Sequence, residues 1–447
     1  VKRLRGAYAL GVVSLAKPQE MVAARRGNPL VIGIGEGENM IASDITAIIN
    51  RTKRYIILDD NEVAIVRPDS VVVMNEFGDT VEKEIMTVTW DMSAAEKGGY
   101  QHFMLKEIME QPKAVADTVK PRIKNDAVVF EDNGLTDERL REIEHIHIIG
   151  CGSALHAGMV GKRVIEAMCR IRCTAEVASE FRYENPIIGK KDMCIVISQS
   201  GETADTLAAM RLAKQAGAFT IAIVNVVSST IGREADGVLY TWAGPEISVA
   251  TTKAYSAQLS ALYLISVKIA RVRGLISIGD ERALCAELQR LPECIEQTLG
   301  CQSDMQRIAT LYANRSSVFF LGRGLDYAAA LEASLKLKEI SYIHSEAYAA
   351  GELKHGTISL IEEGTLVVAL ATQPALFEKT VSNIREVVAR GASVVLVTTD
   401  DFTGDASVCQ HLVRLPKCLY EFSDSLSIIP MQLLASYIAV ERKCHVD

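Results

Sequence analysis

The sequence predicts an α/β fold in which two parallel-sheet subdomains follow an antiparallel β-rich segment. From His145 onward, strand-like apolar runs alternate with helical segments, as in parallel sheets covered by helices on both faces. This pattern occurs twice, because a strand-like run ends in a Gly-x-Gly turn at Gly150 and again at Gly322. The first ninety residues lack this alternation and consist of short apolar runs between turn residues.

Size and charge restrict the function classes. A chain of 447 residues is too long for one ordinary domain, and a net charge of -8 argues against a nucleic-acid-binding surface. The ten cysteines form no CxxC pairs and have no histidines at zinc-site spacing, so we expect no metal, no other cofactor and a reducing cytoplasm. The apolar stretch 254–272 contains Gln258, Lys268 and Arg271, which favours a buried helix over a membrane span.

The amino-terminal segment is predicted to be antiparallel β structure without catalytic residues of its own. It contains neither Cys nor His, and the polar stretch 91–99 that follows has the composition of a linker. The predicted divisions are therefore 1–90, a linker at 91–99, a first α/β domain at 100–300 and a second at 301–447. Strands are expected at 8–13, 30–34, 55–58, 63–66 and 71–74.

The two α/β halves follow in order. In the first, strands are expected at 145–149, 193–197, 220–224 and 237–241. Helices are expected at 103–117 with an interruption at Pro112, at 137–143 and at 153–170; a further helix ends at 217 and another begins at 252. In the second, strands are expected at 318–321, 366–370 and 394–397, with helices through 340, at 375–390 and at 429–441.

The stretch Ser198–Thr203 is the strongest candidate site. Its hydroxyls follow an expected strand and precede an expected helix, where free N–H groups and the positive end of the helix dipole suit a phosphate. An ordinary Ser/Thr helix cap is the alternative. The corresponding stretch of the second half, Ala371–Ala375, has lost the hydroxyl cluster and carries Pro374, so only the first half is expected to bind phosphate.

Three further stretches could complete a site. The hydroxyls of Thr251 and Thr252 precede a helix, which they could cap, or they could contact a polyol. Lys336 and Glu339 share a helix face, although a surface ion pair would have the same spacing. His355 lies in an expected loop and is suited to proton transfer near neutral pH, although such a histidine is often incidental.

Three motifs in this order closely resemble those of the glutamine:fructose-6-phosphate amidotransferase family: Ser198–Thr203, Leu335–His344 and Glu346–Gly356. Residues from about 97 onward resemble the family's two sugar isomerase (SIS) domains. Residues 1–90 resemble the trailing half of its N-terminal-nucleophile glutaminase (glutamine amidotransferase type 2) domain, and the motifs at residues 4–8 and 38–44 carry this resemblance. The resemblance implies formation of D-glucosamine 6-phosphate and L-glutamate from D-fructose 6-phosphate and L-glutamine, by a homodimer.

The resemblance also implies roles for individual residues. Glu339 would move a proton between C1 and C2, Lys336 would stabilise the developing charge, and His355, from the neighbouring subunit, would open the sugar ring. The remaining implied residues bind substrate: Ser198, Gln199, Ser200 and Thr203 at the phosphate, and Ser153, Val249 and Thr251 along the sugar.

The sequence departs from the family pattern in places. Ala154, Thr357 and Ser248 replace a hydroxyl residue, a proline and a glycine. The family's amino-terminal nucleophilic Cys and its carboxyl-terminal Arg-Asn-Leu-Ala-Lys motif, whose Lys forms an imine with the sugar, do not occur in this stretch. We therefore expect glutamine to be a partner only of the intact protein. Two alternatives remain open: a hexose-phosphate isomerase without amination and a non-catalytic sugar-phosphate sensor.

Overall fold

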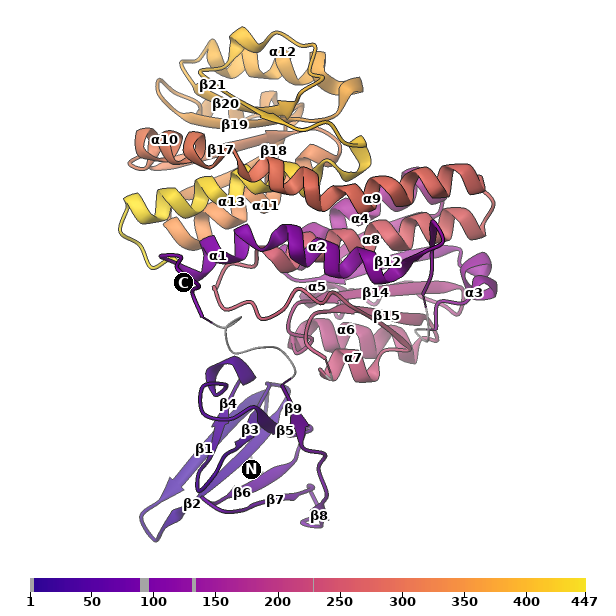
Figure 1. The fold of residues 1–447 in the computed structure, drawn as a ribbon, viewed down its shortest axis with the longest axis vertical. Coiled ribbons are helices and arrows are strands. Elements are labelled where there is room, and N and C mark those ends of the chain that lie inside the picture. Colours follow the sequence, from indigo (N-terminus) through magenta and orange to yellow (C-terminus); the bar gives the residue numbers. More distant parts are fainter. Residues whose placement is uncertain (1–3, 89–95, 131–133, 228) are drawn as a thin grey trace. The chain divides into compact units, whose positions relative to one another are not determined.

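The computed structural model describes residues 4–88, 96–130, 134–227 and 229–447 (Figure 1). It divides into two compact units, one formed by 1–98 with 202–204 and the other by 99–201 with 205–447. Part of the expected linker, residues 91–95, lies outside the described residues. The exact domain divisions expected from the sequence stay predictions.

The amino-terminal unit contains two antiparallel sheets, as predicted. One has the strand order β1-β2-β6-β7-β8 and the other β4-β3-β5-β9. Buried aliphatic side chains of β2, β6 and β7 form one core with those of β3 and β5, so the sheets pack face to face. The strands are β1 (Tyr8–Ser14), β2 (Lys17–Arg26), β3 (Val31–Ile34), β4 (Asn39–Ala42), β5 (Arg54–Ile57), β6 (Val63–Val66), β7 (Val71–Met74), β8 (Thr80–Val81) and β9 (Met86–Thr87).

The larger unit contains two parallel five-stranded sheets of the same topology. Their orders are β13-β12-β14-β15-β16 and β18-β17-β19-β20-β21, so both read 2-1-3-4-5 in their own numbering. The strands are β12 (His145–Gly150), β13 (Arg172–Val177), β14 (Asp192–Ser198), β15 (Phe219–Val224), β16 (Gly237–Tyr240), β17 (Ser317–Gly322), β18 (His344–Ala349), β19 (Leu366–Ala371), β20 (Ser393–Thr399) and β21 (His411–Leu415); a hairpin of β10 (Ile123–Lys124) and β11 (Ala127–Val128) precedes them. The predicted duplication is confirmed.

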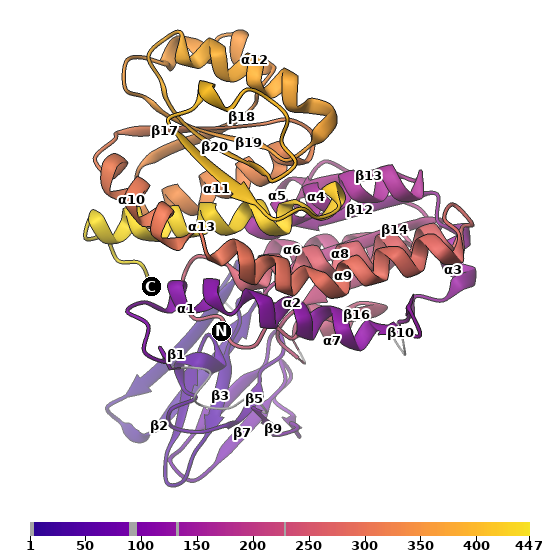
Figure 2. The ribbon, with the colours of Figure 1, turned by 45° about the horizontal axis from the view of Figure 1, so that its top comes forward.

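Helices form a shared layer between these two sheets and cover their outer faces (Figures 1 and 2). One continuous core joins the inner faces of both sheets through α1, α2, α4, α8, α9, α10, α11 and α13, whereas α5–α7 and α12 cover the outer faces. The helices are α1 (Phe103–Met109), α2 (Gln111–Val119), α3 (Asp137–Glu142), α4 (Ser153–Cys169), α5 (Ala178–Phe181), α6 (Ala204–Gln215), α7 (Thr230–Glu234), α8 (Lys253–Val272), α9 (Ile278–Leu299), α10 (Gln302–Tyr312), α11 (Leu325–Ser341), α12 (Phe377–Val388) and α13 (Asp424–Glu441).

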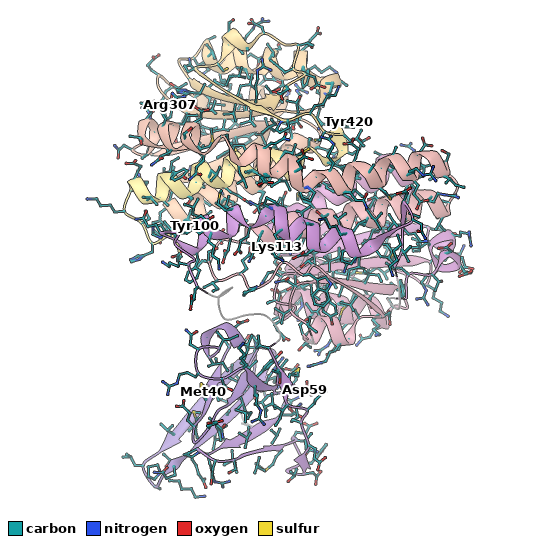
Figure 3. The ribbon with its side chains drawn as sticks, in the orientation of Figure 1. Met40, Asp59, Tyr100, Lys113, Arg307 and Tyr420 are labelled. Atoms are coloured by element: carbon teal, nitrogen blue, oxygen red, sulfur yellow. The ribbon has the colours of Figure 1, made fainter. Side chains whose placement is uncertain are left out.

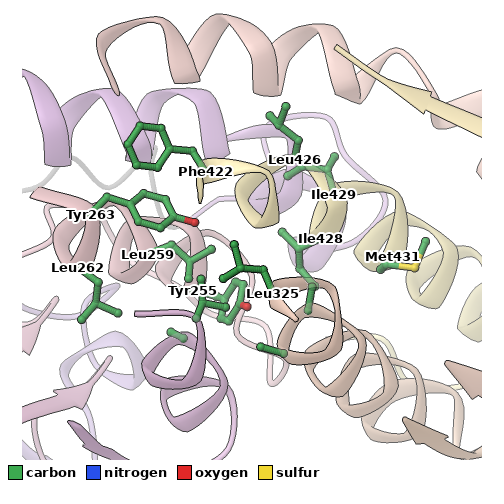
Figure 4. Packing of buried hydrophobic residues seen from close by; sticks show 14 of the residues in the cluster. Tyr255, Leu259, Leu262, Tyr263, Leu325, Phe422, Leu426, Ile428, Ile429 and Met431 are labelled. Carbon is green, nitrogen blue, oxygen red and sulfur yellow. The ribbon is translucent and has the colours of Figure 1, made fainter. Parts of the chain in front are cut away.

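The middle of this layer is tightly packed. Figure 4 shows α8 meeting the start of α13, where the Tyr263 and Phe422 rings lie 4.7 Å apart between centroids. Helix α8 is buried along nearly its whole length, as expected, and within the described residues no helix combines the length and apolarity that crossing a bilayer requires. Charged side chains occupy the outer helix faces, such as Lys113 on α2 and Arg307 on α10 (Figure 3).

Several boundaries and elements differ from the sequence predictions. The interruption near Pro112 separates α1 from α2, with the break at Glu110. Helix α13 begins at Asp424 rather than at 429 and contains Pro430 in its second turn, where the ring removes only one donor. The predicted helix 375–390 is α12, preceded by a 3-10 turn at Pro374–Leu376. The edge strands β13, β18 and β21 and the helices α9 and α10 had not been predicted.

Candidate active site

The turn after β14 is held in one conformation by its own residues. The Ser198 hydroxyl accepts a hydrogen bond from the Gly201 N–H at 3.0 Å. Gly201 has φ +67°, and a Cβ there would lie 2.1 Å from the Ser229 hydroxyl oxygen. Only glycine fits this position, for conformational and steric reasons together. Gln199 and Ser200 are partly buried in the same turn.

Sheet topology brings a second predicted residue to this edge. The chain leaves β12 toward β13 on one side and returns to β14 on the other, so the order reverses between β12 and β14. Ligands of open parallel sheets bind at the carboxyl ends of the strands at such a point. Ser153 is there, as the first residue of α4 after β12, and it is buried. Ser153 and the Ser198–Ser200 turn therefore follow neighbouring strands at one edge.

Helix α11 brings a buried cation to a pair of carboxylates. The Lys336 ammonium lies 2.8 Å from a Glu339 carboxylate oxygen and 3.5 Å from a Glu332 oxygen. The Lys336 side chain is 1% exposed and that of Glu339 is 28% exposed. The alternative of a surface ion pair is therefore wrong, because one partner is enclosed.

The charge of Lys336 is maintained by its neighbours. Burial lowers the pKa of the Lys336 ammonium, but the carboxylates of Glu332, Glu339 and Glu246 raise it, and their effect is larger, so the net pKa shift is upward. Lys336 is thus a cation throughout the neutral range, and the partly exposed Glu339 is the partner that a substrate can reach.

This charged cluster lies beside the turn that follows β12. The His156 ring of α4 is 2.8 Å from the second oxygen of Glu332, measured from Nδ1. A Cβ added to Gly152 would lie 3.9 Å from the Leu335 side chain, next to Lys336. Residues of the first half and of the second half therefore line one place in the larger unit.

A carboxylate, rather than a hydroxyl, caps α8. One Glu246 oxygen accepts from the backbone N–H groups of Thr252 at 2.9 Å and Ala254 at 3.1 Å, and the Thr252 side chain makes no capping bond. The suggestion that threonine hydroxyls cap this helix is thus wrong. Val249 is 70% exposed and Thr251 is partly buried, in the loop that leads to the cap.

The same loop is fixed from α1. One Glu107 oxygen accepts from the Ile247 N–H at 2.6 Å and the Ser248 N–H at 3.2 Å. Burial and the nearby Glu246 carboxylate raise the pKa of Glu107 to about 7, although its hydrogen bonds to Ser248 and Ile247 lower it.

Two predicted site residues are not gathered with the others. His355 ends a short 3-10 turn, Glu352–Lys354, and is exposed; among the described residues, no side chain hydrogen-bonds or forms an ion pair with its ring. Thr203 belongs to the amino-terminal unit. The roles implied for both residues stay predictions.

In the second half, the turn after the corresponding strand is occupied by a carboxylate of the chain itself, that of Asp326. After β19, the Thr372 N–H donates to Asp326 at 3.0 Å, the Thr372 hydroxyl donates to its other oxygen, and the Gln373 N–H also donates to it. Burial raises the pKa of Asp326 to about 6, against the effect of these hydrogen bonds. The N–H groups that face a ligand in a phosphate turn are thus already used here.

Sequence reasoning missed Glu332, His156, Glu246 and Glu107. Glu107 and Ser248 are 141 positions apart, and His156 and Glu332 are 176 positions apart, so no local pattern predicts these contacts. Among the described residues, a group with metal-ligand spacing, His145, His147 and Asp192, lies at the opposite, amino-terminal ends of β12 and β14.

Comparisons with known proteins agree with this geometry. The SIS domain family model matches residues 139–268 and 311–440, one copy for each parallel sheet. The C-terminal domain of glucosamine-fructose-6-phosphate aminotransferase from Francisella tularensis superposes with a TM-score of 0.76 at 35% identity, covering 79% of this chain and 99% of that domain.

Two curated relatives match along the whole chain, and both are named glutamine–fructose-6-phosphate aminotransferase (isomerizing). The relative from Caldanaerobacter subterraneus subsp. tengcongensis is 53% identical over 446 residues, which are 100% of this chain and 73% of the relative. The relative from Clostridium tetani is 50% identical, with 100% and 74% coverage. With both parallel sheets matched and identity this high over its full length, the chain belongs to the glutamine–fructose-6-phosphate aminotransferase (isomerizing) family of enzymes.

Proposed function

We propose that this chain binds fructose 6-phosphate at the carboxyl edge of its first parallel sheet and provides the isomerase chemistry of glucosamine 6-phosphate formation. The observation that carries the proposal is the buried Lys336 beside the partly exposed Glu339, next to the turn that follows β12. The names of the relatives support the choice of substrate. Glutamine is the nitrogen donor that those names imply for the intact protein.

The phosphate is assigned to the turn of Ser198, Gln199, Ser200 and Thr203. Helix α6 begins directly after this turn, and the positive end of its dipole favours an anion there. The sugar would extend from this turn past Ser153, with Val249 and Thr251 along its other side. Glucosamine 6-phosphate, the product, would occupy the same place.

Glu339 is assigned the proton transfer between C1 and C2. A general base must accept and return a proton, and an accessible carboxylate paired with a fixed cation can do both. Lys336 would stabilise negative charge that develops on the substrate, since a preorganised buried cation is more effective than one in water. Glu332 holds Lys336 from its other side.

His355 is assigned ring opening in the site of a second copy, which makes the active form a homodimer. Its exposure supports this assignment, because no described side chain of its own chain occupies the ring. Mixing His355→Asn and Glu339→Gln proteins tests it. Each protein alone is expected to be inactive, but a mixed dimer has one site with both native residues, so random mixing restores about a quarter of the activity. A mixture as inactive as its parents would refute the shared site.

The reaction itself can be tested with ammonium as the nitrogen source. Fructose 6-phosphate and ammonium are supplied to the chain, and both glucosamine 6-phosphate and glucose 6-phosphate are measured. The proposal is supported if the native chain forms aminosugar and the Glu339→Gln variant does not, while the affinity of the variant for the sugar phosphate stays close to native. Glucose 6-phosphate alone would indicate a plain isomerase, and tight binding without either product would indicate a sensor.

The proposal also includes the domain boundaries and the cellular compartment. We place the partial glutaminase domain at 1–90, the linker at 91–99 and the SIS domains at 100–300 and 301–447. The ten cysteines are all thiols in the structure, which fits a reducing cytoplasm.

A further inference from the structure

The amino-terminal end of the first parallel sheet gathers imidazole and carboxylate groups that the proposed reaction does not use. His145 and His147 point to the same face of β12, because side chains two apart in a strand do so. Asp192 begins the neighbouring β14 and is in register with His145. One ligand atom from each of these residues lies within 4.8 Å of the other two.

The hydrogen bond of one ring fixes which nitrogen is available. His147 Nδ1 lies 3.1 Å from a Glu176 carboxylate oxygen, which can only accept, so Nδ1 carries the proton. In the neutral ring, Nε2 then carries no proton and has its lone pair available. A carboxylate that holds the far nitrogen of a histidine in this way is the usual outer partner of a metal-bound imidazole.

The available nitrogens are buried and unsatisfied. The Nε2 atoms of both His145 and His147 are inaccessible to solvent and have no hydrogen-bond partner among the residues that the structure describes, and the whole His147 residue is only 4% exposed. A buried acceptor without a donor is costly unless something else fills that role. The His145 and His147 ring centroids are 4.1 Å apart, so both rings face one small region.

The surroundings keep these side chains in place. The Asp192 carboxylate accepts from the Gly189 N–H at 2.6 Å, and one of its oxygens lies within 4.8 Å of a nitrogen of each ring. Phe181 of α5 packs against His147 with ring centroids 6.0 Å apart. The charged groups in register on this face are Arg172, Glu176 and Asp192, so carboxylates outnumber cations.

We propose that His145 Nε2, His147 Nε2 and Asp192 bind a divalent transition cation of the zinc type. Two imidazoles and a carboxylate are a donor set that such cations favour, and three protein ligands leave a fourth position for water. Ligands about 2.1 Å from one ion are at most about 4.2 Å apart. Binding therefore requires the side chains to move together by a fraction of an ångström.

The proposed role is structural. Strand β14 runs from Asp192 to Ser198, and six residues at about 3.3 Å each place the cation roughly 20 Å from the phosphate turn. An ion there joins β12 to β14 at one end of the sheet while the substrate occupies the other. The expectation of no metal rested on cysteine spacing, which a His-x-His strand with a distant aspartate does not display.

The test uses the full chain without a histidine tag, treated with a chelator and dialysed. Zinc titration in the calorimeter is expected to show one equivalent per chain and a melting temperature that rises until that equivalent is bound. His147→Gln and the less buried His145→Gln are each expected to weaken binding at least tenfold, and His344→Gln, on an exposed edge strand, is the matched control. Binding that is equally tight in both variants, or weaker than millimolar in the native chain, would overturn the assignment.

Cobalt(II) distinguishes this site from the ten thiols. Four-coordinate cobalt on nitrogen and oxygen ligands gives visible d–d bands without an intense near-ultraviolet sulfur-to-metal band. The His145→Gln protein provides the readout if His147→Gln does not fold, as judged by circular dichroism. A strong thiolate band in the native protein would place the ion on cysteine and refute the proposed ligands.

Discussion

Replacing Glu332 with glutamine tests the buried charge cluster most directly. The change keeps the size of the side chain and removes its charge, 3.5 Å from the Lys336 ammonium. Two unit charges at that distance attract by about 5 kcal/mol at an effective dielectric constant of 20. Breaking a buried ion pair from one side typically costs about 3 to 5 kcal/mol, and Glu339, which still contacts Lys336, favours the lower value. We expect a loss of about 3 kcal/mol in the free energy of unfolding.

A double-mutant cycle with Lys336→Met separates the pair from each residue's other contacts. Unfolding in urea is followed by far-ultraviolet circular dichroism, whose helical signal comes almost entirely from the larger unit. The double variant is expected to be more stable than the sum of the single losses implies, because it buries no unpaired charge. Asp117→Asn, which breaks the exposed Lys113 pair on α2, is the control and should cost less than about 1 kcal/mol. Additive single losses, or a Glu332→Gln protein as stable as the native chain, would refute the reasoning.

The remaining predictions concern the loops around the site. The pKa of Glu107 is about 7 in the fold, against an ordinary value of 4.5. The folded state therefore binds more protons between these pH values, and stability falls as pH rises through them, by at most about 3 kcal/mol. Glu107→Gln should abolish that slope in urea unfolding at a series of pH values; a slope that persists would assign it to other groups. Gly201→Ala should destabilise the chain by clearly more than Gly274→Ala, which has the same sign of φ and open space around it, and equal losses would show that the contact with Ser229 yields. Ser200→Ala should weaken fructose 6-phosphate binding by about 1.5 to 3 kcal/mol in calorimetry, and unchanged affinity would remove Ser200 from the site.

The parts of the fold that could be predicted are those with a strong local signal. The central strands β12, β14, β17, β19 and β20 are buried on both faces and are nearly continuous apolar runs. The edge strands β13, β18 and β21 are only half-buried and carry charged residues such as Glu176 and Glu346, so their runs are interrupted. Their pairing depends on the neighbouring strand rather than on their own composition.

Helix α9 had a readable signal that was overlooked. The Ser277 hydroxyl caps the helix by accepting from the Asp280 N–H at 3.1 Å, and the Asp280 carboxylate accepts from the Ser277 N–H at 2.9 Å. This reciprocal pair is the capping-box spacing of a helix start, visible in the sequence as Ser-x-x-Asp.

The candidate site was predictable only where its residues are close in sequence. Lys336 and Glu339 are one helical turn apart, so their shared face followed from spacing. That Lys336 is buried did not follow, because α11 is enclosed on most of its sides by α4, α13 and the three strands β17, β18 and β19. His156 and Glu332 come from different halves, and no local sequence pattern predicts a contact between residues so far apart in the chain.

The carboxylate of Asp326 in the second half has a consequence for binding stoichiometry. A gene duplication would by default leave two equivalent sites in each chain, and two sites could communicate within one molecule. Because Asp326 already accepts from the Thr372 and Gln373 N–H groups after β19, we expect each chain to have a single sugar-phosphate site, the one proposed in the first half. A Hill coefficient above one for this ligand would therefore have to originate between chains.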